Sequence, residues 1–199
     1  MSNKLLLATA ACMAVIGSWT LADAASVQLD YRVLATTRMS TMEKELNEAA
    51  GKGYRFSKVM GGKTAAGGQE VAIAVVKYAA AVESVVPVYK LLATTRTSTM
   101  QKELQEWANK GYEYLDQTVF QIVFGDQVVV ILELDPARTG APSRYRLLAT
   151  SKTSTMEREL REAGEDGFML LGFTVGRTEF GGEEIVSILR KAFRRNEAN

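Results

Sequence analysis

The chain of 199 residues has no histidine, a single cysteine (Cys12) and only three prolines. Histidine is the usual general base near neutral pH and the commonest metal ligand, so its absence excludes Ser-His-Asp catalysis, Cys-His catalysis and histidine metal sites. One cysteine excludes a disulfide within the chain and a zinc-thiolate cluster. Basic and acidic residues nearly balance, with a net charge of +1, so composition gives no general attraction to nucleic acid or anionic lipid.

The first residues have the pattern of an export signal. Lys4 gives a positive start, residues 5–19 are mostly apolar, and residues 22–24 read Ala-Asp-Ala, the small-x-small pattern of a cleavage site. We expect cleavage between Ala24 and Ala25, which removes Cys12 and leaves a periplasmic or secreted protein. A membrane anchor is the first alternative, but the run is shorter than the roughly 20 residues of a spanning helix. A lipoprotein signal with lipid on Cys12 is the second.

Against these absences, the chain repeats one segment three times. It reads YRVLATTRMSTMEKELNEA from Tyr31, YKLLATTRTSTMQKELQEW from Tyr89 and YRLLATSKTSTMERELREA from Tyr145. The copies start 58 and 56 residues apart, so one supersecondary unit occurs in tandem. Each unit predicts a strand, a helix and a hairpin of two further strands. The expected organisation is a signal peptide over 1–24 and β-α-β-β repeats over 30–78, 88–134 and 144–191.

Each predicted helix has start and stop signals. Ser40, Ser98 and Ser154 all precede a Glu or Gln by three positions, the pattern of a capping box in which the serine caps the first turn. Gly53, Gly111 and Gly167 follow the helical pattern, where glycine adopts the left-handed conformation cheaply.

The third strands, at 71–76 and 128–132, are continuous apolar runs, which predicts burial on both faces of the sheet. A helix covers only one face, so another repeat has to cover the other. We expect an α+β fold of antiparallel sheets with helices on the outside in a pseudo-threefold arrangement, the sheet faces meeting centrally. A homo-oligomer that buries the same face is the alternative. The sequence leaves open whether the units close into a ring or lie in a row.

The turn after each helix reads Gly-Tyr-Glu from Gly111, Gly-Tyr-Arg from Gly53 and Gly-Phe-Met from Gly167. This part of the repeat resembles small bacterial βαββ domains of unknown function, in which a Gly-Trp-Glu or Gly-Tyr-Glu turn ends the helix. The third copy departs from that turn. The resemblance covers nearly all of the chain after the signal and implies the fold, with no catalytic residues to carry over. The strand order is also similar to dodecin, a flavin-storing oligomer, but no tryptophan recurs here to imply a flavin site.

One polar cluster recurs where each first strand joins its helix. A helix N-terminus presents unpaired N–H groups and partial positive charge, which a neighbouring cation reinforces. Hydroxyls and a cation at that point form a candidate site for a carboxylate, sulfate or phosphoester. The alternative is that the hydroxyls only cap the helix and the cation is a solvated strand end. The candidate residues are Arg38, Ser40, Thr41, Arg96, Ser98, Thr99, Lys152, Ser154 and Thr155.

These observations favour an exported, non-catalytic protein that serves binding or structural assembly, with an unknown protein partner or itself as the partner. The alternative is a small anionic-ligand-binding protein that uses the helix N-termini with Arg38, Arg96 and Lys152. We expect no enzyme activity, cofactor or metal, no nucleic-acid partner, and no membrane span after signal cleavage.

Overall fold

The computed structural model describes residues 28–63, 68–79, 85–122, 125–138, 142–177 and 182–192. The predicted signal peptide and its cleavage site lie outside these residues. Repeat 1 consists of β1 (Leu29–Thr36), α1 (Met39–Gly51), β2 (Arg55–Lys63) and β3 (Gln69–Tyr78). Repeat 2 consists of β4 (Val88–Thr94), α2 (Thr97–Asn109), β5 (Glu113–Ile122) and β6 (Gly125–Leu134). Repeat 3 consists of β7 (Arg144–Thr150), α3 (Thr153–Glu165), β8 (Met169–Arg177) and β9 (Glu183–Lys191). The predicted α+β class and the three β-α-β-β repeats are confirmed.

Each repeat forms its own three-stranded antiparallel sheet with the third strand in the centre, in the orders β1-β3-β2, β4-β6-β5 and β7-β9-β8. The helices end as predicted, because Gly53, Gly111 and Gly167 have φ angles of 88°, 90° and 82°, which glycine adopts at little cost. Among the described residues, no helix combines the length and the hydropathy needed to cross a bilayer.

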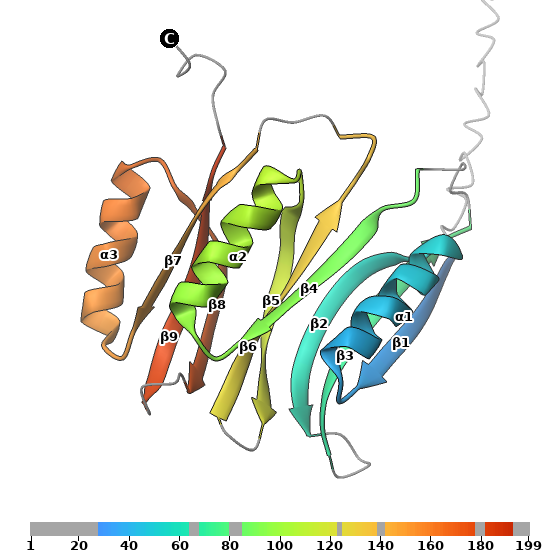
Figure 1. Cartoon of the computed structure of the whole chain (residues 1–199), viewed down its shortest axis with the longest axis horizontal. Helices are drawn as coiled ribbons and strands as arrows, with labels where there is room; N and C mark the ends of the chain where they lie inside the picture. The colour runs from blue at the N-terminus through green and yellow to red at the C-terminus, as the bar shows by residue number, and fades with distance from the viewer. Residues whose placement is uncertain are drawn as a thin grey trace, which may run out of the picture.

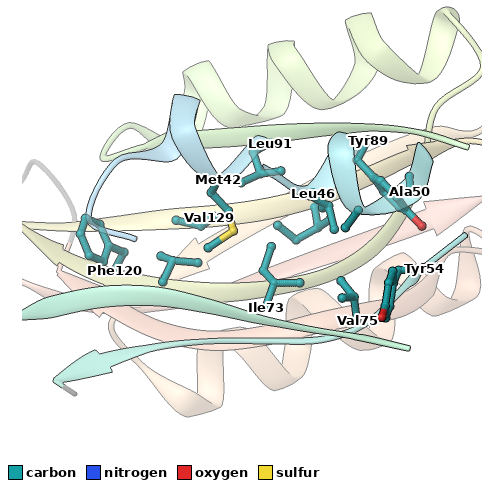
Figure 2. Packing of buried hydrophobic residues seen from close by; sticks show 13 residues of the cluster. Met42, Leu46, Ala50, Tyr54, Ile73, Val75, Tyr89, Leu91, Phe120 and Val129 are labelled. Atoms are coloured by element: carbon teal, nitrogen blue, oxygen red, sulfur yellow. The ribbon is translucent and has the colours of Figure 1, made fainter. Parts of the chain in front are cut away.

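The three repeats stand side by side in a row, with repeat 2 in the middle (Figure 1). Helix α1 packs on two sheets at once. Its buried side chains Met42 and Leu46 share one cluster with Ile73 of its own sheet and with Leu91 and Val129 of repeat 2 (Figure 2). The first helix therefore packs on one face of sheet 1 and also on sheet 2, on the face that does not carry α2.

Helix α2 repeats this arrangement one step along the row. Met100 and Leu104 share a cluster with Val130 of their own sheet and with Val186 and Ile188 of repeat 3. Among the described residues, no further sheet packs on the far side of helix α3. Its cluster is smaller, with Ala163, Phe168 and Leu189 as the buried members.

The arrangement of the repeats differs from the expected pseudo-threefold body with sheets meeting centrally. Two of the three helices lie between sheets instead of on the outside. Burial of the third strand on both faces is confirmed in repeat 2, where every residue from Val128 to Leu132 is buried. The second face of sheet 2 is covered by repeat 1, through α1 beside β4 and through β2 and β3 beside β5.

Candidate functional site

The predicted anion sites lie at the N-termini of three separate helices. In every repeat the basic residue and the serine are exposed and the threonine is half-buried. The sets are Arg38, Ser40 and Thr41 on α1, Arg96, Ser98 and Thr99 on α2, and Lys152, Ser154 and Thr155 on α3. The fold therefore does not bring the three sets together into one site.

The capping boxes predicted at the serines are wrong. The helices begin one residue earlier than the serines, and the N-cap residues are the basic ones, which make no side-chain cap hydrogen bond. A threonine at the end of the strand forms the local turn instead, since the backbone N–H of Arg38 donates to Thr36 Oγ1 at 3.2 Å. The same bond recurs in repeats 2 and 3 at 3.1 and 3.3 Å.

Beside the second set lies a small recess between repeats 2 and 3. It has a volume of about 10 Å³ and is lined by Arg96, Thr97, Asp126 and Arg177 among others. Such a volume holds one water molecule at most. The Asp126 carboxylate lines it and accepts the Arg177 backbone N–H at 2.9 Å. The negative charge of Asp126 therefore lines the recess and would repel an anion bound there.

The glutamate expected in the first capping box contacts the next repeat. Glu43 Oε2 accepts the backbone N–H of Leu91 at 3.0 Å, and the same carboxylate pairs with Lys90 Nζ at 2.9 Å. One turn later, Asn47 accepts the backbone N–H of Tyr89 and donates to its carbonyl oxygen, both at 2.9 Å. Two side chains of α1 thus bind the outer edge of β4.

Helix α2 binds β7 in the same way. Gln101 Oε1 accepts the backbone N–H of Leu147 at 2.6 Å and Gln101 Nε2 donates to the carbonyl of Tyr145 at 3.0 Å. Gln105 Oε1 accepts the backbone N–H of Tyr145 at 3.1 Å. Both β4 and β7 are edge strands whose outward backbone groups would otherwise offer a pairing edge to another chain. We call this set of helix-to-edge bonds the edge clamp.

The tyrosine that opens each repeat crosses to the repeat before it. The Tyr89 hydroxyl accepts the backbone N–H of Phe56 at 3.0 Å, and the Tyr145 hydroxyl accepts that of Tyr114 at 2.8 Å. Both amides are free to bond because the ladders are irregular there, between Phe56 and Lys58 and at the matching place in β5. Burial raises the pKa of the Tyr89 phenol, so the hydroxyl stays neutral.

The second strands of neighbouring repeats approach closely. The backbone N–H of Gly61 donates to Thr118 Oγ1 at 2.8 Å, and Gln117 Nε2 donates to Thr174 Oγ1 at 2.9 Å. A Cβ atom at Gly61 would overlap the backbone of Val119 in the facing strand. A Cβ atom at Gly172 would overlap the side chain of Gln117. Glycine is therefore required at Gly61, where the facing atoms are backbone, whereas at Gly172 the facing atoms are the ends of the Gln117 and Tyr114 side chains.

Sequence reasoning missed these contacts between repeats, although two signals were present. Tyrosine opens all three copies, and an amide side chain stands at the same helical position in the first two, as Asn47 and Gln105. In the third copy that position is Arg161, which pairs with Glu157 of its own helix at 2.9 Å and is exposed.

Within the described residues, repeats 1 and 3 each contact one neighbouring repeat, whereas repeat 2 contacts two. Tyr31 is 60% exposed, whereas the matching Tyr89 and Tyr145 are 2% and 3% exposed. At the other end, Phe173 of β8 is 53% exposed, whereas the matching Gln117 of β5 is 7% exposed. The same positions are thus covered inside the row and open at its ends.

We define two surfaces from these residues. The head surface is the outer face of sheet 1, where register places five exposed apolar side chains together: Leu29, Tyr31, Val33, Met60 and Tyr78. The tail surface is the free side of repeat 3, made of Glu157, Arg161, Leu170, Phe173 and Val175. The two surfaces lie at opposite ends of the row (Figure 1).

Comparison of the chain with protein families, with curated proteins and with solved structures gives no match in any of the three. The resemblance to bacterial βαββ domains and to dodecin stays a prediction. Within the part of the chain that the structure describes, no three Asp, Glu, His or Cys residues are grouped to hold a metal ion. The two open ends are therefore the candidate functional surfaces.

Proposed function

We propose that this protein is an exported, non-catalytic protein that serves binding or assembly through the head and tail surfaces. The observation that carries the proposal is the placement of exposed apolar side chains. Among the described residues, eight of the twelve large hydrophobic side chains exposed to solvent lie on these two surfaces. Contiguous exposed apolar area commonly marks an interaction site.

The use of the recurrent polar groups supports a non-catalytic role. Glu43 and Asn47 of α1 and Gln101 and Gln105 of α2 are engaged in the edge clamp. Other helix charges form exposed pairs one turn apart, such as Lys110 with Glu106. Such pairs are typical of a solvated helix surface rather than of a reaction centre.

The experiment is site-specific photo-crosslinking in an exporting bacterium. A benzoylphenylalanine residue replaces Val33 on the head surface, Phe173 on the tail surface, or Lys102, an exposed control on α2. We expect discrete protein adducts at the two end positions and none at the control position, with the partner identified by mass spectrometry. The same background of adducts at all three positions would contradict the proposal.

The anionic-ligand alternative has its own outcome in the same study. It is favoured if the end positions give no adduct and sulfate raises the melting temperature of the wild-type protein. That rise has to disappear when Arg38, Arg96 and Lys152 are all replaced by alanine, because ligand binding stabilises only a protein that retains the site.

A further inference from the structure

We propose that the tail surface binds the head surface of a second copy of this chain and so continues the row of repeats from one molecule to the next. This inference rests on the proposed function and names its partner. The same interface occurs twice inside the molecule, between repeats 1 and 2 and between repeats 2 and 3. The head and tail surfaces are the two unmatched halves of that interface.

The first continuity is the tyrosine contact. Tyr31 matches Tyr89 and Tyr145, whose hydroxyls accept the backbone N–H groups of Phe56 and Tyr114. The matching amide in repeat 3 is that of Leu170, at an equivalent irregularity in the ladder between Leu170 and Gly172. In the proposed contact, the Tyr31 hydroxyl of one copy therefore accepts the backbone N–H of Leu170 of another copy.

The second continuity is the edge clamp. Glu157 stands where Glu43 and Gln101 stand, and these accept the backbone N–H of Leu91 and Leu147. The matching group on the free edge of β1 is the N–H of Val33. Charge also matches, because Glu43 pairs with Lys90 and the residue in the place of Lys90 is Arg32 in repeat 1. The Glu157 carboxylate of one copy thus meets Arg32 and the β1 edge of the next.

The third continuity is apolar. Inside the row, Gln117 of β5 donates to Thr174 of β8. At the ends, the matching residues are Phe173 on the tail surface and Met60 on the head surface, both exposed. The polar pair of the inner interface is therefore replaced by an aromatic side chain and a methionine, which make favourable contact when buried together.

One residue, Arg161, makes the proposed interface between molecules weaker than the interfaces between repeats inside the molecule. Arg161 stands where Asn47 and Gln105 each accept the backbone N–H of a tyrosine. A guanidinium has no acceptor, so Arg161 can donate to the carbonyl of Tyr31 but cannot accept its N–H. We therefore expect reversible, concentration-dependent association rather than a permanent oligomer.

Because the head and tail surfaces differ and lie at opposite ends, the contact is heterologous and generates chains or closed rings. A two-fold dimer, in which both copies use the same patch, is a different outcome. A heterologous interface needs one intact head surface and one intact tail surface, so variants that disrupt only one of the two surfaces test it.

The experiment is sedimentation velocity and native mass spectrometry over a concentration series of the exported protein. The single variants Met60→Glu and Phe173→Glu place a charge on the head or on the tail, and Val86→Glu is a control at an exposed apolar residue outside both surfaces. We expect multimers for the wild type and for Val86→Glu. Each of the other two variants should associate at least about tenfold more weakly, as for a central interface residue.

Mixing the two end variants is the decisive measurement. Met60→Glu keeps an intact tail and Phe173→Glu keeps an intact head, so the mixture should form a one-to-one dimer and nothing larger. Far-ultraviolet circular dichroism shows whether each variant is folded. Multimers that survive in both single variants, or a mixture that stays monomeric, would overturn the inference.

A wild-type protein that remains monomeric at every concentration would also overturn it. That result leaves the proposed function standing if the crosslinkers at Val33 and Phe173 still capture another protein. Failure of both experiments would reject the proposed function together with the inference.

Discussion

Gly61 and Gly62 are adjacent residues of β2 with very different surroundings. A Cβ atom on Gly61 would overlap the backbone carbonyl of Val119 in the next repeat, while a Cβ atom on Gly62 would have no atom within 4 Å. The facing group at Gly61 is backbone, which cannot turn aside as a flexible side chain can. The contact between repeats 1 and 2 therefore depends on one missing methyl group.

We predict that Gly61→Ala lowers the free energy of unfolding by about 1–3 kcal/mol, the usual cost of overpacking a close contact. Gly62→Ala should leave it unchanged or raise it by up to about 1 kcal/mol, because alanine restricts the unfolded chain. Urea denaturation of the two variants beside the wild type gives both values. Equal losses would mean that the effect belongs to glycine in a strand and not to the contact with Val119.

The same scale shows where prediction from sequence stops. The positive φ of Gly53, Gly111 and Gly167 was predictable because a local rule decides it. The role of Glu43 was not, because the pattern Ser-x-x-Glu describes a capping box equally well. Its carboxylate bonds instead to Leu91, a residue far along the chain, and no local pattern encodes such a partner.

At the scale of the element, the edge clamp joins a helix to the edge strand of the next repeat. Asn47 makes two bonds to the backbone of Tyr89. Arg161 occupies the same helical position in α3, which in the described part of the chain contacts no strand of a following repeat. One position of the repeat can thus be tested with and without its partner.

We predict that Asn47→Ala lowers the free energy of unfolding by about 1–3 kcal/mol, because it leaves backbone groups of Tyr89 unpaired. Helix propensity alone predicts the opposite sign, since alanine is the better helix former. Arg161→Ala should change stability by less than about 0.5 kcal/mol, as at most exposed positions. Thermal and chemical denaturation both measure these differences, and a stabilised Asn47→Ala variant would show that the clamp contributes nothing.

The periodicity of apolar residues predicted the positions of the strands and helices, but it did not predict which elements pack on each face of a sheet. The apolar run 128–132 correctly predicts that both faces of β6 are covered. It does not say whether a sheet or a helix covers the second face, because Val129 and Ile131 present the same apolar surface to either. The cover is repeat 1, which contributes both α1 and the strands β2 and β3. The stripe of Met42 and Leu46 does not indicate in sequence that α1 also faces a second sheet.

At the scale of the whole molecule, the row is uneven in stability. Helices α1 and α2 are each covered by two sheets, and α3 is covered by one. In a repeat array, each unit is stabilised by its own fold and by its interfaces with neighbours. Repeat 1 has one neighbour but its helix is enclosed, so the weakest helix is α3.

We predict that the backbone amides of α3 exchange with solvent faster than those of α1 and α2, because local opening of α3 breaks fewer apolar contacts. Hydrogen exchange followed by mass spectrometry compares the three helices in one sample, and their equal length of 13 residues makes the comparison direct. The measurement is made at low protein concentration, where copies are apart. Raising the concentration should slow exchange in α3 and leave α2 unchanged, because a second molecule would then cover Glu157 and Arg161. Equal protection of all three helices in the dilute sample would show that the end of the row is stabilised by some other part of the chain.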